Sequence, residues 1–147
     1  MSLKRLRAGE LVAFVGAVCV IVSLFAPWYE NAGGKLSGWD TFGVAAGLLL
    51  VAAITALCLV VATVTERSTA LPVAAAVWST LFGIVGVIAA IVRLLERPQD
   101  ATELCAGAWL GFVGAILILV GAWLSMRDER PALYEPARPT PREPPPA

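Results

Sequence analysis

Four long apolar segments, almost free of charged residues, constrain the fold of this 147-residue chain more than any motif does. We expect them to form helices at about residues 9–28, 41–64, 70–95 and 104–126. About 20 apolar residues, rising 1.5 Å each, cross the roughly 30 Å hydrocarbon core of a bilayer. A crossing segment must be helical, because lipid offers no partner for an unpaired backbone amide.

The composition agrees with a membrane protein. Hydrophobic residues make up 59% of the chain and charged residues 15%, against about 45–50% and about 25% in soluble domains. The sequence predicts an all-α fold, a polytopic bundle of four transmembrane helices over residues 1–126. Residues 127–147 contain seven prolines and are predicted to be a disordered, proline-rich cytoplasmic tail.

A secretory signal peptide is the alternative interpretation of the first segment, which follows Lys4, Arg5 and Arg7. Cleavage requires small residues at the site. Leu24 occupies one of the critical positions, and Pro27 directly follows the candidate site. We therefore expect the first segment to be a retained helix.

The basic residues predict the orientation. With the N-terminus inside, the inner side carries eight lysines and arginines and the outer side three, namely Lys35, Arg93 and Arg97. The positive-inside rule favours this arrangement, with both termini cytoplasmic in a bacterial plasma membrane. Tryptophans concentrate at membrane surfaces. We expect Trp28, Trp39 and Trp109 near the outer surface, Trp123 near the inner one, and Trp78 as a deeper packing residue.

The sequence gives no positive support for an enzyme. It has no histidine, and its three cysteines, Cys19, Cys58 and Cys105, are widely separated. No nucleophile–base set, metal site, cofactor site or nucleic-acid site can be recognised. Ion pathways usually contain a charge near the middle of the membrane, and these segments contain none. Arg93, Glu96 and Arg97 are expected to form a solvated helix end, with an Arg93–Glu96 pair of little energetic value.

Small residues recur at helical spacing and predict close helix contacts. Two GxxxG steps stand at Gly43–Gly47 and Gly107–Gly111, Gly83 continues a small-residue stripe on the third helix, and Gly9 begins one on the first. Such steps let membrane helices approach closely. Packing within one bundle is the favoured interpretation, and a dimer or partner-binding face is the alternative.

The segment between the first two helices carries aromatic residues on both sides of a flexible centre. Trp28, Tyr29, Trp39 and Asp40 form a candidate outer-loop binding site for a sugar, a lipid headgroup or a protein loop. The alternative is that the aromatic residues only anchor two helix ends at the interface, where they are enriched for physical reasons.

Over about residues 10–130 the chain resembles a group of small, uncharacterised four-helix membrane proteins of actinobacteria. The segments that carry the resemblance are Pro27-Trp28-Tyr29, Ser37-Gly38-Trp39, Leu71-Pro72-Val73-Ala74-Ala75, Gly107-Ala108-Trp109-Leu110-Gly111 and Ser125-Met126-Arg127-Asp128-Glu129. The resemblance implies a bacterial plasma membrane. It implies no activity, and no functional residue is carried over.

Together these features predict a non-enzymatic integral membrane protein, an accessory or scaffold protein of the bacterial cell envelope. Its partners would be the lipid bilayer and other membrane proteins or further copies of itself. The alternative is a small permeation or lipid-handling protein that uses the outer aromatic site. A continuous polar or lipid-sized cavity between the helices would favour this alternative.

Overall fold

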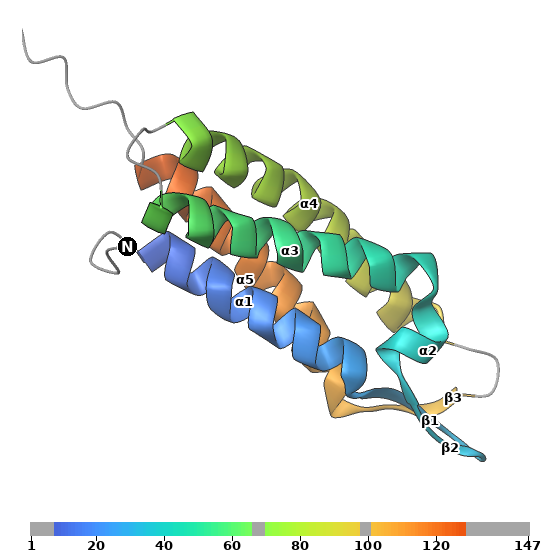
Figure 1. Ribbon diagram of the computed structural model, residues 1–147. Helices are drawn as coiled ribbons and strands as arrows, with labels where there is room; N and C mark the ends of the chain where they lie inside the picture. Colours follow the sequence, from blue (N-terminus) through green and yellow to red (C-terminus); the bar gives the residue numbers. More distant parts are fainter. Residues whose placement is uncertain (1–7, 66–69, 98–100, 129–147) are drawn as a thin grey trace, which may run out of the picture.

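A computed structural model describes residues 8–65, 70–97 and 101–128 of the chain. Four long helices lie side by side, α1 (Ala8–Phe25), α3 (Val44–Thr65), α4 (Ala70–Leu95) and α5 (Ala106–Asp128) (Figure 1). All four are long and apolar enough to cross a membrane. The predicted all-α architecture with four candidate spans is confirmed. Most of the predicted tail, from residue 129 on, lies outside the described residues.

Long helices that follow one another in the sequence pack side by side, and the first and last helices also pack together. Helix α1 packs against α5 and α3, and α4 packs against α3 and α5. The bundle has two distinct ends (Figure 1). One is the termini end, where α1 begins and α5 finishes, and the other, called the sheet end below, carries the short strands.

Glycines close the seam between α1 and α5. A Cβ atom added at Gly16 would lie 2.6 Å from the backbone nitrogen of Ile118, and one added at Gly9 would lie 2.7 Å from that of Ser125. On the other side of the seam, a Cβ atom at Gly114 would lie 2.9 Å from the nitrogen of Val20. The two backbones therefore touch directly, the arrangement in which small residues hold membrane helices together.

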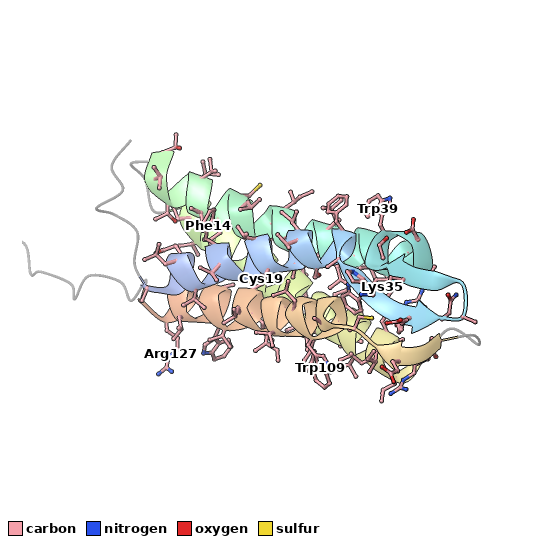
Figure 2. The ribbon with its side chains drawn as sticks, turned by 90° about the horizontal axis from the view of Figure 1, so that it is seen from below. Phe14, Cys19, Lys35, Trp39, Trp109 and Arg127 are labelled. Carbon is pink, nitrogen blue, oxygen red and sulfur yellow. The ribbon has the colours of Figure 1, made fainter. Side chains whose placement is uncertain are left out.

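Apolar side chains cover the outside of the bundle, as a lipid solvent requires. Figure 2 shows Phe14, Trp39 and Trp109 projecting away from the helices. Trp78 is 56% exposed and stacks on Phe82 rather than packing inside the bundle. The prediction of a packing role for Trp78 is therefore wrong. Its helix position faces outward, where the bilayer supplies the apolar surroundings that an aqueous solvent would not.

A three-stranded antiparallel sheet caps one end of the bundle and was not predicted from the sequence. It consists of β1 (Pro27–Asn31), β2 (Gly34–Ser37) and β3 (Ala101–Leu104), in the order β2-β1-β3. Gly34, directly after the turn between β1 and β2, takes φ +129°. L side chains rarely adopt this backbone conformation, so glycine suits the position.

Three helix boundaries differ from the predicted ones because of this cap. The first helix ends at Phe25, since β1 begins at Pro27. The short helix α2 (Gly38–Phe42) precedes α3, and Gly43 with φ +51° separates the two. Helix α5 begins at Ala106, because β3 extends to Leu104 and the amide of Cys105 still donates to the carbonyl of Trp28 in β1 (2.8 Å).

Candidate functional site

Three buried rings organise the sheet end, and we call Trp28, Tyr29 and Phe42 the aromatic cluster. The Trp28 and Phe42 rings meet edge to face, with centroids 4.3 Å apart, and Tyr29 meets Phe42 at 6.1 Å. The indole Nε1 of Trp28 donates to the carbonyl of Ser23 (2.7 Å). Buried indoles usually find such a partner. The cluster therefore joins the end of α1 to β1 and α2.

Two glycines make room for the Trp28 ring. A Cβ atom added at Gly38 would lie 2.8 Å from Trp28 Nε1, and one added at Gly111 would lie 2.8 Å from its Cη2 atom. Gly38 and Gly111 belong to the sequence segments Ser37-Gly38-Trp39 and Gly107–Gly111. Because neither glycine has a side chain, a slot remains between the two positions, and the indole of Trp28 occupies it.

Arg93, near the end of α4, attaches that helix to the aromatic cluster. Its Nη2 donates to the carbonyl of Phe42 (2.8 Å), and its guanidinium lies 5.2 Å from the centre of the Phe42 ring. The hydroxyl of Tyr29 donates to the backbone carbonyl of Arg93. The prediction of a solvated helix end is wrong for Arg93, whose side chain is half-buried, because the guanidinium turns toward Phe42.

The pKa of the Tyr29 hydroxyl lies above its ordinary value of 10.0. Burial is the main cause, because it penalises the charged phenolate, while the positive charges of Arg93 and Arg97 act in the opposite direction. Tyr29 is therefore neutral at physiological pH and can donate its proton to the Arg93 carbonyl.

The structure separates the residues of the predicted outer-loop site. Trp28 and Tyr29 are fully buried, whereas Trp39 and Asp40 are exposed. Trp39 stacks on the exposed ring of Phe25, with centroids 6.3 Å apart. Asp40 accepts a hydrogen bond from the Ser37 hydroxyl (2.6 Å) at the start of α2. A single surface made of all four side chains does not exist here, because the two strand residues point into the bundle end.

The five glycines predicted to pack helices also fall into two groups. Gly83 approaches the backbone of Leu119, Gly107 approaches Pro27 and Gly111 approaches Trp28. Gly43 and Gly47, by contrast, are exposed, and a Cβ atom added at either would meet nothing within 4 Å. The prediction that Gly43 and Gly47 pack against other helices of the bundle is therefore wrong. Gly43 instead provides the break between α2 and α3.

A lateral groove of about 660 Å³ opens beside the aromatic cluster, between α3 and α4. Its apolar lining includes Val44, Leu48, Val85 and Ile88, and its polar lining includes Thr41, Arg93 and Glu96. A second groove of about 440 Å³ lies near Pro27 and Trp109, and its lining residues carry no charge. The α3–α4 groove is the candidate functional site, because it combines an apolar channel with charged groups, as ligand sites commonly do.

The polar lining of the groove consists of side chains that can form hydrogen bonds with a ligand. Within residues 8–65, 70–97 and 101–128, histidine, cysteine, aspartate and glutamate form no cluster of three that could hold a metal ion. Arg93 and Glu96 offer a hydrogen-bond donor and an acceptor of opposite charge. Both residues stand out in the sequence as charges at a helix end, but the groove cannot be predicted from it, because the lining from α3 depends on how the two helices pack.

Searches against known protein families, curated proteins and solved structures return no match for the chain. The class of the protein therefore rests on its four long apolar helices. It is an integral membrane protein with four candidate transmembrane helices and a small sheet at one end.

Proposed function

We propose that the chain is a non-enzymatic accessory or scaffold protein of the bacterial plasma membrane, with both termini in the cytoplasm. The resemblance to actinobacterial four-helix proteins supports the bacterial plasma membrane, and the distribution of basic residues supports the orientation. The observation that carries the accessory role is the closed seam between α1 and α5.

That seam disfavours permeation through the bundle. A transporter must open a path between its helices, whereas the glycine backbones of α1 and α5 lie in direct contact along the seam. Separating them would lose the contacts that small residues provide in lipid. The buried polar residues of the described chain are Glu10, Ser23, Ser79 and Ser125. Ser23 lies near the sheet end of α1, whereas Glu10 and Ser125 lie near the termini end.

An accessory protein acts through its surfaces, and the sheet end provides a rigid one. The hairpin of β1 and β2 presents exposed Lys35, which Figure 2 shows at the far end of the bundle from Arg127. Hydrogen bonds and ring contacts fix the strands to α1 and α4 through the aromatic cluster. A partner that binds this end would therefore meet a preformed surface.

Photo-crosslinking in native membranes tests the accessory role. A photoreactive amino acid replaces Lys35 in the hairpin or, in a second variant, Val51 on the lipid-facing side of α3. It is activated by light in the membrane, before the protein is solubilised in mild detergent. We expect one recurrent crosslinked membrane protein or a crosslinked second copy. The matched control activates the same variants after detergent dilution. Recovery of a lone monomer at both positions under several conditions would contradict the proposal.

Lipid handling is the second candidate function, and the α3–α4 groove is the observation that favours it. The predicted aromatic site does not supply this role, since Trp28 and Tyr29 are buried. The groove instead reaches the exterior of the bundle, where lipid can enter from the side.

A further inference from the structure

The α3–α4 groove has the length of one leaflet of a bilayer. Its lining on α4 extends from Val85 to Glu96, a stretch of roughly 16 Å at 1.5 Å per residue. Half of a hydrocarbon core is about 15 Å thick. The volume of about 660 Å³ falls within the range of roughly 300–1,000 Å³ for ligand sites. The groove can therefore hold an acyl chain along its length.

The charged mouth of the groove lies at the depth of lipid headgroups. From Ala70 to Arg93, α4 measures about 35 Å, so these residues can occupy opposite surfaces of a roughly 30 Å core. Leu48 and Val85 then lie at the level of the acyl chains, whereas Val44, at the start of α3, and Glu96 lie near the membrane surface beside Arg93. The groove thus places its apolar floor deeper in the membrane than its charged mouth. A phospholipid has the same order, with its acyl chains below its headgroup.

Arg93 and Glu96 supply a pair of opposite charges at this mouth. A guanidinium has five N–H donors, and the bond from Nη2 to Phe42 leaves others for a phosphate. Glu96 is exposed and follows Arg93 by three residues, so the two side chains leave neighbouring positions on one face of α4 and both line the groove. In an ethanolamine headgroup only two carbons separate the phosphate oxygen from the ammonium, so one headgroup at this mouth carries a negative group for Arg93 and a positive group for Glu96.

We propose that the α3–α4 groove binds a phospholipid with a primary-ammonium headgroup, its phosphate on Arg93, its ammonium on Glu96 and one acyl chain along the apolar floor. The proposal rests on lipid handling, the second candidate function, and adds the class of lipid that is bound. It does not depend on the accessory role. A lipid can bind whether or not a protein partner is found, so the two proposals can fail separately.

Other occupants fit the charges less well. A phosphate-only headgroup would place its negative charge beside Glu96 without a compensating ammonium. A choline headgroup keeps the positive charge but has no N–H to donate to the carboxylate. A helix from another protein would fill the apolar floor but offers neither charge by default. The uncharged groove near Trp109 provides an internal comparison, because it should accept acyl chains without headgroup preference.

Native mass spectrometry of the full-length purified protein tests the proposal. Synthetic phosphatidylethanolamine, phosphatidylcholine and phosphatidylglycerol with identical acyl chains are titrated separately, and the lipids retained per chain are counted. We expect phosphatidylethanolamine to bind about tenfold more tightly than the other two, the effect of one charge-assisted hydrogen bond.

Variants assign this preference to the groove. Glu96→Gln should reduce phosphatidylethanolamine binding to the level of phosphatidylcholine, and Arg93→Gln should weaken all three lipids. Val44→Trp should obstruct the mouth of the groove, since Val44 lines the groove at the start of α3, beside Arg93. Exposed positions such as Val44 and Glu96 tolerate substitution, so these two variants remain informative if Arg93→Gln misfolds.

Two matched controls complete the test. Arg97→Gln removes an exposed arginine outside the groove lining, and Val113→Trp fills the uncharged groove. Both should leave the preference unchanged. Equal retention of the three lipids by the native chain would overturn the proposal, as would unchanged phosphatidylethanolamine binding in Val44→Trp. Loss of a bound protein rather than of lipid in Val44→Trp would also overturn it, by assigning the groove to a protein partner.

Discussion

Trp28 and Tyr29 are consecutive residues of one strand, yet both side chains are buried. Successive residues of a regular strand point to opposite faces. The pairing of β1 with β2 shifts register between Pro27 and Tyr29, and such an irregularity redirects side chains. The sequence therefore shows no two-residue periodicity at this point. The aromatic residues could be recognised from the sequence, but their inward direction could not, because it depends on how β1 pairs with its two neighbouring strands.

Tyr29 should lose its proton only above its ordinary pKa of 10.0. The folded chain binds this proton more strongly than the unfolded chain, because burial penalises the phenolate. The resulting stabilisation is complete below about pH 10 and is lost as the pH rises through the raised folded value. Ultraviolet absorbance of tyrosinate measures the midpoint in the variant Tyr134→Phe, in which Tyr29 is the remaining tyrosine.

The denatured form of the same variant serves as the control and should titrate near 10.0. Identical midpoints in the folded and denatured forms would show that the ring is accessible to water. This result would contradict the buried position of the Tyr29 side chain, which contacts Phe42 and the end of α4.

At the scale of elements, glycine spacing predicted the right kind of contact but only part of its location. Gly9 and Gly107 were recognised as members of small-residue steps, whereas Gly16, Gly114 and Gly121 complete the α1–α5 seam. Gly9 and Gly16, like Gly107, Gly114 and Gly121, are separated by two helical turns, a signal that the GxxxG pattern does not include. Gly43 and Gly47 satisfy that pattern and still face outward, because spacing alone does not say which helix face is buried.

Gly16→Ala should destabilise the bundle by about 1–3 kcal/mol, the usual cost of overpacking. The added Cβ atom would meet backbone atoms of Gly114 and Ile118 at 2.6–2.7 Å, and backbone cannot move aside as a side chain can. The free energy of unfolding in mixed micelles measures the effect.

Gly47→Ala is the matched control on α3, because a Cβ atom there has open space. Its free energy of unfolding should stay within about 0.5 kcal/mol of the native value, as for most surface substitutions. Equal effects of Gly16→Ala and Gly47→Ala would show that the α1–α5 seam is not closed by backbone contact.

For the whole molecule, hydrophobicity alone predicted the four helices, because each segment is apolar over the full thickness of a bilayer. The sheet end could not be predicted in the same way. Its strands are four or five residues long, and β1 pairs with β3, from which α2, α3 and α4 separate it in the sequence. The candidate groove depends on the same long-range packing, since its lining comes from both α3 and α4. Hydrophobicity thus predicts the spans, and tertiary contacts determine the binding surfaces.

The central claim is a four-crossing protein whose sheet end and termini end lie on opposite sides of the membrane. Labelling with a membrane-impermeant thiol reagent tests it most directly. Cys105 lies at the sheet end but is half-buried, so Lys35→Cys in the exposed hairpin is the better reporter, in a chain with Cys19, Cys58 and Cys105 replaced by alanine. A second variant carries its only cysteine in the tail, at Ala132. We expect Lys35→Cys to react in intact cells and Ala132→Cys to react only after permeabilisation. Reaction of the tail alone would reverse the proposed orientation, and equal reaction of both in intact cells would contradict the four crossings.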